Sequence, residues 1–217
     1  MKFPNAAKGI KKLFTAEVLY LISVILIGIG TIFALVSQSK EGFSAVILSS
    51  VAVGGIIVIV ALVLQIVGVI QASKDEASFK GVIYVTLFGI AVSVVASLLS
   101  ALFRDNAILP SISNLVSSIV SVISTVLIIL GICNLMNQIG KQDLVVKGGK
   151  VLRIIVWLAI LSLIMRFINI FLPSNFDDAK PLAKVIVLCL CILAVILEIA
   201  EYVLYISLLS KASKELN

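Results

Sequence analysis

The sequence of 217 residues contains no histidine, and only 13% of its residues are charged. Without histidine, the chain lacks both the usual general base at neutral pH and the commonest metal ligand. It also has no phosphate-binding loop, nucleophile elbow or dinucleotide fingerprint, and Gly28 and Gly30 stand in an apolar run without the remaining glycine of the last motif. We therefore expect no enzymatic activity and no cofactor, with a lipid-active enzyme as the alternative left open.

Cysteine is also scarce, and all three cysteines, Cys133, Cys189 and Cys191, lie in apolar runs. Cys189 and Cys191 point about 200° apart on a helix, so they cannot pair with each other. We interpret all three as small packing residues rather than as a disulfide framework or a metal site.

Apolar residues, in contrast, make up 61% of the chain and form long runs. A run of about 20 apolar residues crosses the roughly 30 Å hydrocarbon core of a bilayer, and a helix satisfies its own backbone hydrogen bonds there. The sequence predicts an all-α integral membrane protein with six transmembrane helices. The predicted spans are 17–37, 43–72, 81–103, 108–138, 151–172 and 182–210.

A basic segment, residues 1–16, precedes the first span. Its apolar residues Ile10, Leu13 and Phe14 share one side of a helix, which predicts an amphipathic helix at the membrane interface. A signal peptide is the alternative, but the apolar run 18–36 is long for one and no Ala-x-Ala site ends it. We therefore expect the first span to be retained.

Short charged breaks recur between the apolar runs and suggest an internal repeat. Lys-Gly opens each of three units and a Ser-Lys or Gly-Lys pair closes it, with near-equal spans of 8–74, 80–141 and 147–214. This pattern predicts three tandem helical hairpins in the same orientation, at 17–74, 80–141 and 147–214. The alternative is that the similar charged loops arose by convergence, without duplication, in a low-complexity apolar sequence.

Three such hairpins resemble mitochondrial carriers in outline. Those carriers have a Pro-x-Asp/Glu-x-x-Lys/Arg signature, which follows none of the four prolines here, so we exclude that family. The size and the six spans are also similar to the substrate-binding subunits of energy-coupling-factor vitamin transporters. That resemblance implies a subunit of a multi-component transporter.

Basic residues are distributed unevenly between the two sides of the predicted bundle. Of the 17 lysines and arginines, twelve fall on the side of the termini and five on or near the other side. The positive-inside rule places both termini and the loops 74–80 and 140–150 in the cytoplasm, and the loop 173–181 outside. Anionic lipids at the cytoplasmic face, or a protein partner at the basic loops, account for the charge of +6 without a nucleic acid.

Weakly polar residues form a stripe along the fourth span. They recur at i, i+3, i+4, i+7 and i+11, which places them on one face of a helix. Two interpretations are open: a hydrated path lined by hydroxyl groups, or close helix packing, which small residues permit. We favour packing. The stripe consists of Asn114, Ser117, Ser118, Ser121 and Thr125.

Ionisable residues inside the last two spans are the strongest candidates for chemistry. Glu198 and Glu201 share a face with Tyr202 in the sixth span, and Arg166 and Asn169 lie in the fifth. A charge at mid-bilayer costs roughly 3 kcal/mol, so such residues pair, face water or lie off-centre. Arg166 and Glu198 differ by about 10 Å in depth at 1.5 Å per residue, which disfavours a direct salt bridge.

Snorkelling to an interface explains Arg166 and Glu201, but it explains Glu198 least well. We therefore expect Glu198 to face the interior of the bundle, where it is the best candidate for binding a proton or cation. Two functions follow, a transporter or channel-like protein for an ion or small solute, and a non-catalytic scaffold or subunit. Transport is narrowly preferred. A polar cavity reaching Glu198 would favour transport, and a dry bundle with an exposed groove would favour the subunit.

Overall fold

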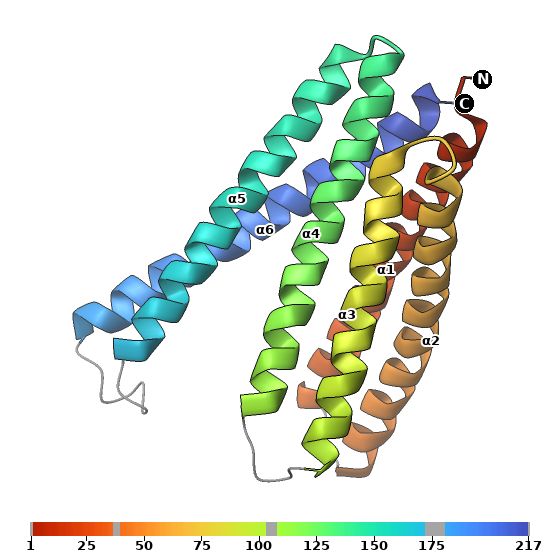
Figure 1. The fold of residues 1–217 in the computed structure, drawn as a ribbon. Coiled ribbons are helices and arrows are strands. Elements are labelled where there is room, and N and C mark those ends of the chain that lie inside the picture. The colour runs from red at the N-terminus through yellow and green to blue at the C-terminus, as the bar shows by residue number, and fades with distance from the viewer. Residues whose placement is uncertain (1, 37–39, 103–107, 172–180, 217) are drawn as a thin grey trace. The chain divides into compact units, whose positions relative to one another are not determined.

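The computed structural model describes residues 2–36, 40–102, 108–171 and 181–216. These residues form six helices, drawn in Figure 1: α1 (Pro4–Val36), α2 (Lys40–Ala72), α3 (Ala77–Leu102), α4 (Ile108–Gln138), α5 (Gln142–Phe171) and α6 (Pro181–Glu215). Five of them, α1 to α4 and α6, are long and apolar enough to cross a membrane, and α5 is also long at 30 residues. The prediction of six long helices is confirmed, five of them are apolar enough to span a membrane, and insertion in a membrane stays a prediction.

Helix ends agree with the sequence where an apolar run stops abruptly. α2 ends at Ala72 and α4 spans 108–138, as predicted. α1 begins at Pro4, so residues 4–16 of the basic segment form its first part and continue directly into the first predicted span. The reason is tertiary: Ile10 and Leu13 are buried against the rest of the chain, which keeps the segment in line with α1.

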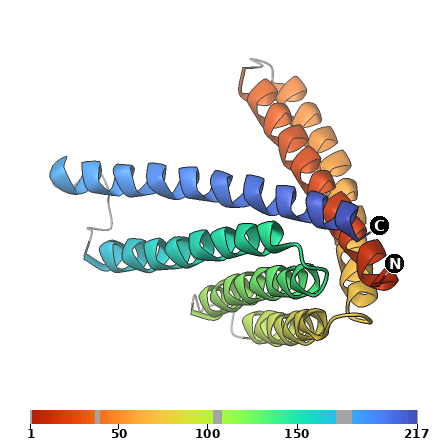
Figure 2. The ribbon, with the colours of Figure 1, turned by 90° about the horizontal axis from the view of Figure 1, so that it is seen from above.

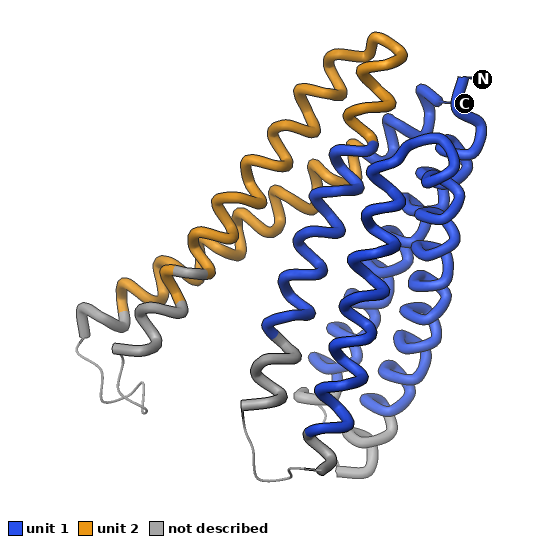
Figure 3. Tube along the Cα trace, viewed as in Figure 1, with its two compact units in different colours: residues 1–131, 209–217 blue, residues 132–208 orange. Residues whose placement is uncertain are grey.

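The chain forms two compact units, coloured separately in Figure 3. Unit 1 comprises residues 1–131 and 209–217, and unit 2 comprises residues 132–208. α4 and α6 therefore contribute to both units. Within unit 1, the first turn of α1 and the last turn of α6 lie close together (Figures 1 and 2). The three-hairpin repeat stays a prediction.

Small residues hold α1 against α2. A Cβ atom added at Gly9 would lie 2.5 Å from the carbonyl oxygen of Gly68, and one added at Gly68 would lie 2.8 Å from the carbonyl oxygen of Gly9. Farther along, the Ser23 hydroxyl donates to the carbonyl oxygen of Gly54 at 3.2 Å. Such close backbone contact increases dispersion attraction, which drives helix association where lipid removes the hydrophobic drive.

Two short turns, between α4 and α5 and between α2 and α3, are stabilised by different capping interactions. α4 ends in a Schellman motif, in which Lys141 N–H donates to Met136 O (2.9 Å) and Gly140 N–H donates to Asn137 O (3.0 Å). Gly140 has φ of +77°, the left-handed conformation that this motif requires. At the other turn, the Glu76 carboxylate accepts from the Ser78 hydroxyl (3.0 Å) and the Ser78 N–H (3.4 Å), which caps α3.

Candidate functional sites

The carboxylates of α6 lie on a helix whose surface is largely uncovered. Glu198 is exposed, and Glu201 and Tyr202 are half-buried. In the most apolar 18-residue window of α6, none of the residues is buried. The described residues of the chain leave Glu198 exposed, and the expectation that it faces the interior of the bundle stays a prediction. Helical periodicity identifies residues that share a face, but it does not indicate which face a neighbour covers.

Three further candidates have side chains outside the described part of the chain. Arg166 and Asn169 belong to α5, and Asn114 belongs to α4. Their proposed roles stay predictions. The structure thus brings Glu198, Glu201 and Tyr202 together on one helix, as the sequence predicts, and leaves their pairing with α5 untested.

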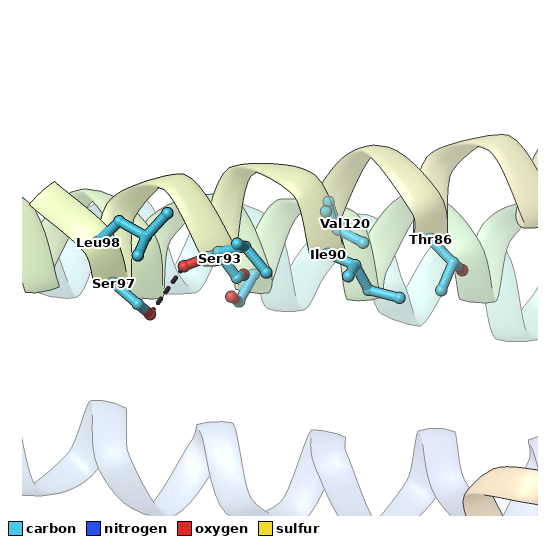
Figure 4. A pocket seen from close by; sticks show the side chains of 9 residues that line it. Thr86, Ile90, Ser93, Ser97, Leu98 and Val120 are labelled. Carbon is cyan, nitrogen blue, oxygen red and sulfur yellow. Dashed lines mark hydrogen bonds between the residues drawn. The ribbon is translucent and has the colours of Figure 1, made fainter.

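A groove runs between α3 and α4 within unit 1. Its volume is about 550 Å³. Figure 4 shows side chains of α3 projecting from that helix toward the groove. Gly89 lies at its floor, where an added Cβ would come within 2.8 Å of Val120 on α4. The groove is lined by Thr86, Gly89, Ile90, Ser93, Val94, Ser97 and Leu98 of α3 and by Ser117 and Val120 of α4.

Among the members of the α4 polar stripe whose side chains the structure describes, Ser117 alone lines this groove. Ser118 and Ser121 are exposed, and the Thr125 hydroxyl donates to the carbonyl oxygen of Ser121 at 3.1 Å. In the groove itself, the Ser97 hydroxyl donates to the carbonyl oxygen of Ser93 at 2.8 Å. These hydroxyls bond to their own helices, and apolar atoms supply most of the groove surface. The groove therefore offers few polar groups to a solute.

Sequence analysis missed a polar anchor at the start of α1. The Asp75 carboxylate, between α2 and α3, accepts from the backbone N–H groups of Asn5 and Ala6, both at 2.8 Å, and from the Asn5 side-chain amide at 2.9 Å. Pro4 is the first helical residue, so Asn5 and Ala6 supply the amides that an N-cap normally satisfies. Phe3, which precedes the helix, has no side-chain acceptor to cap it.

Electrostatics favour the ionised form of this carboxyl. Partial burial acts to raise the pKa of Asp75, but the hydrogen bonds from Asn5 and Ala6 and the positive charge of Lys74 outweigh burial. The pKa of Asp75 is therefore lowered from its usual value. The sequence indicates this anchor only indirectly. The first turn of α1 has no acidic residue of its own, so a carboxylate from another segment has to complement the positive end of the helix.

The cysteines differ from one another in the structure. All three are free, and Cys133 is buried, with its thiol 3.9 Å from the carbonyl oxygen of Val145. Cys189 and Cys191 are exposed, so the packing interpretation holds for Cys133 alone. Within the described ranges, no group of three or more histidine, cysteine, aspartate or glutamate residues is placed to hold a metal ion.

Comparison of the chain with protein families, with characterised proteins and with solved structures finds no match.

Proposed function

We propose that the chain is a non-catalytic subunit of a membrane assembly, in which a partner helix covers Glu198 on α6. The observation that carries this proposal is the exposure of Glu198 on a span-length helix. Its neighbours Val195 and Ile199 are 53% and 60% exposed, so the carboxylate stands in an apolar surface. Leaving it against acyl chains would cost roughly 3 kcal/mol.

A partner removes that cost if it supplies a positive charge or hydrogen-bond donors at the same depth. Intramembrane carboxylates are stabilised in this way by basic residues or by polar side chains of neighbouring helices. The partner is therefore a transmembrane helix with lysine, arginine or several donor groups opposite Glu198. The same exposed surface is what a subunit of a larger complex presents before assembly.

Photo-crosslinking in native membranes tests this assignment. A photoreactive amino acid at Val195 or Ile199 is expected to give a protein adduct of discrete mass, and peptide sequencing is expected to show a basic or donor-rich apolar helix. The matched control is Val24, which is 67% exposed on α1. Replacement of Glu198 by Gln keeps its shape and removes its charge, so the adduct should fall severalfold. Lipid adducts alone at all three positions would contradict the proposal.

Transport is the second candidate, and the groove with Thr86, Ser93, Ser97 and Ser117 is the observation in its favour. Uptake by proteoliposomes of the purified chain separates the two functions. The subunit proposal expects no proton- or cation-dependent uptake. If the chain alone supports such uptake and Glu198→Gln abolishes it, transport is correct and the subunit proposal is wrong.

A further inference from the structure

A second groove, which we call the lysine groove, lies between the beginning of α1 and the end of α2. Its volume is about 300 Å³, and all of its lining residues belong to unit 1. The α1 residues lie at i, i+3, i+4 and i+7, so they share one face of that helix. The lysine groove is lined by Lys8, Lys11, Lys12 and Thr15 of α1 and by Leu64 and Gln71 of α2.

The lysine groove concentrates positive charge. Like charges three and four residues apart on a helix repel each other. Within the described ranges, none of the three lysines forms an ion pair with an acidic side chain. An anion bound between them would relieve the repulsion, and a phosphate group offers several acceptor oxygens to ammonium groups.

The walls of this groove are fixed by contacts on both sides. An added Cβ at Gly9 would lie 2.7 Å from the backbone nitrogen of Ala72, which shows how closely α1 approaches α2 beside the lysines. Asp75 holds the first amides of α1 through Asn5 and Ala6. The lysines are therefore presented from a helix whose position is already set, which lowers the entropy lost on binding.

A polar side chain in the wall adds a second requirement for the ligand. Gln71 lines the groove, and its Oε1 atom is buried without a hydrogen-bond partner. A buried acceptor without a donor is unfavourable. A ligand hydroxyl that enters the groove beside Gln71 would supply the missing donor. A suitable ligand therefore carries hydroxyl donors as well as a negative charge.

We infer that the lysine groove binds the headgroup of an anionic glycerophospholipid that carries hydroxyl groups, with phosphatidylglycerol as the representative. The phosphate contacts the lysines and a glycerol hydroxyl donates to Gln71. The lipid is favoured over a free phosphate because Leu64, about 10 Å along α2 from Gln71, extends the groove into the apolar part of a candidate span. An acyl chain can follow that direction.

Native mass spectrometry of the full chain in detergent, titrated with defined lipids, tests this inference. Wild type is expected to retain phosphatidylglycerol in preference to phosphatidylcholine. The K8Q/K11Q/K12Q variant should bind phosphatidylglycerol about a hundredfold more weakly, from a loss of about fivefold per lysine. The control K80Q/K150Q/K211Q removes the same charge from three exposed lysines elsewhere and should change binding by less than about threefold.

Three further outcomes would overturn parts of the inference. Equal losses in both triple variants would show diffuse charge attraction and no site. Displacement of the lipid by millimolar inorganic phosphate would show that the ligand is a soluble anion. If Gln71→Leu leaves the preference for phosphatidylglycerol over phosphatidic acid unchanged, the hydroxyl contact is wrong. The K8R/K11R/K12R variant keeps the charge and should keep binding, which separates loss of the site from loss of folding.

Discussion

At the scale of single residues, two acidic side chains differ in whether the folded chain supplies them with a partner. Asp75 is a loop residue in the sequence, yet it satisfies the first free amides of α1. Glu198 is the most conspicuous residue of the last span, yet it is exposed. The first has a structural partner 70 positions away, and the second has its proposed partner in another chain.

We predict that Asp75→Asn loosens the start of α1. The substitution removes the charge that complements the positive end of the helix, which is worth roughly 0.5–1 kcal/mol. Hydrogen exchange at Asn5 and Ala6 should therefore rise about two- to fivefold at neutral pH. Asp143→Asn, in the first turn of α5, is the control and should leave exchange at these two amides unchanged.

The same anchor should depend on pH with a definite sign. The pKa of Asp75 is lowered in the folded chain, so its stabilisation is fully present above the unfolded value of about 3.9. The stabilisation is lost as pH falls through the folded pKa. Wild type and Asp75→Asn should therefore converge in acid. A difference that persists at low pH would show that the carboxylate charge does not hold α1.

At the scale of helices, close approach between α1 and α2 depends on glycine. The Cβ of any other residue at Gly9 would meet backbone atoms of Gly68 and Ala72, which cannot move away as a side chain can. Gly28 and Gly55 lie in the same two helices with nothing within 4 Å of an added Cβ. The two helices thus contain both glycines that a close backbone contact requires and glycines that face open space.

We predict that Gly9→Ala destabilises the α1–α2 pair by about 1–3 kcal/mol, because overpacking forces the backbones apart. Gly28→Ala should be neutral or stabilising by up to about 1 kcal/mol, since alanine has the higher helix propensity. Thermal unfolding in detergent, followed by circular dichroism of the helices, measures both variants. Equal stability of the two variants would mean that the Gly9 contact does not support the fold.

At the scale of the whole molecule, the distribution of charge and apolar surface supports a membrane protein. All six described helices expose large apolar side chains, including Phe33, Leu48, Phe88 and Trp157. A soluble monomer rarely exposes so much contiguous apolar surface. Such a surface is consistent with lipid contact, and the asymmetry of lysine and arginine predicts the orientation.

Topology is testable by labelling in a cysteine-free background. We expect a Ser174→Cys variant to react with a membrane-impermeant maleimide added outside intact cells. A Lys80→Cys variant should react only after the membrane is permeabilised, because the positive-inside rule places the first turn of α3 on the cytoplasmic side. Reaction at position 174 from the cytoplasmic side alone would reverse the orientation.

The sequence by itself determined the helical class, the number of long helices and several of their ends. The physical reason is that apolar run length and helix-breaking loops are local properties, as at Ala72 and Gln138. It also identified the residues that share a face, such as Glu198 and Tyr202. Only the tertiary structure decided that Asp75 anchors α1, that Gly9 meets Gly68, and that Glu198 is exposed. Each of these features depends on which surfaces of the chain contact one another. Residues far apart in the sequence, or a second chain, determine those contacts.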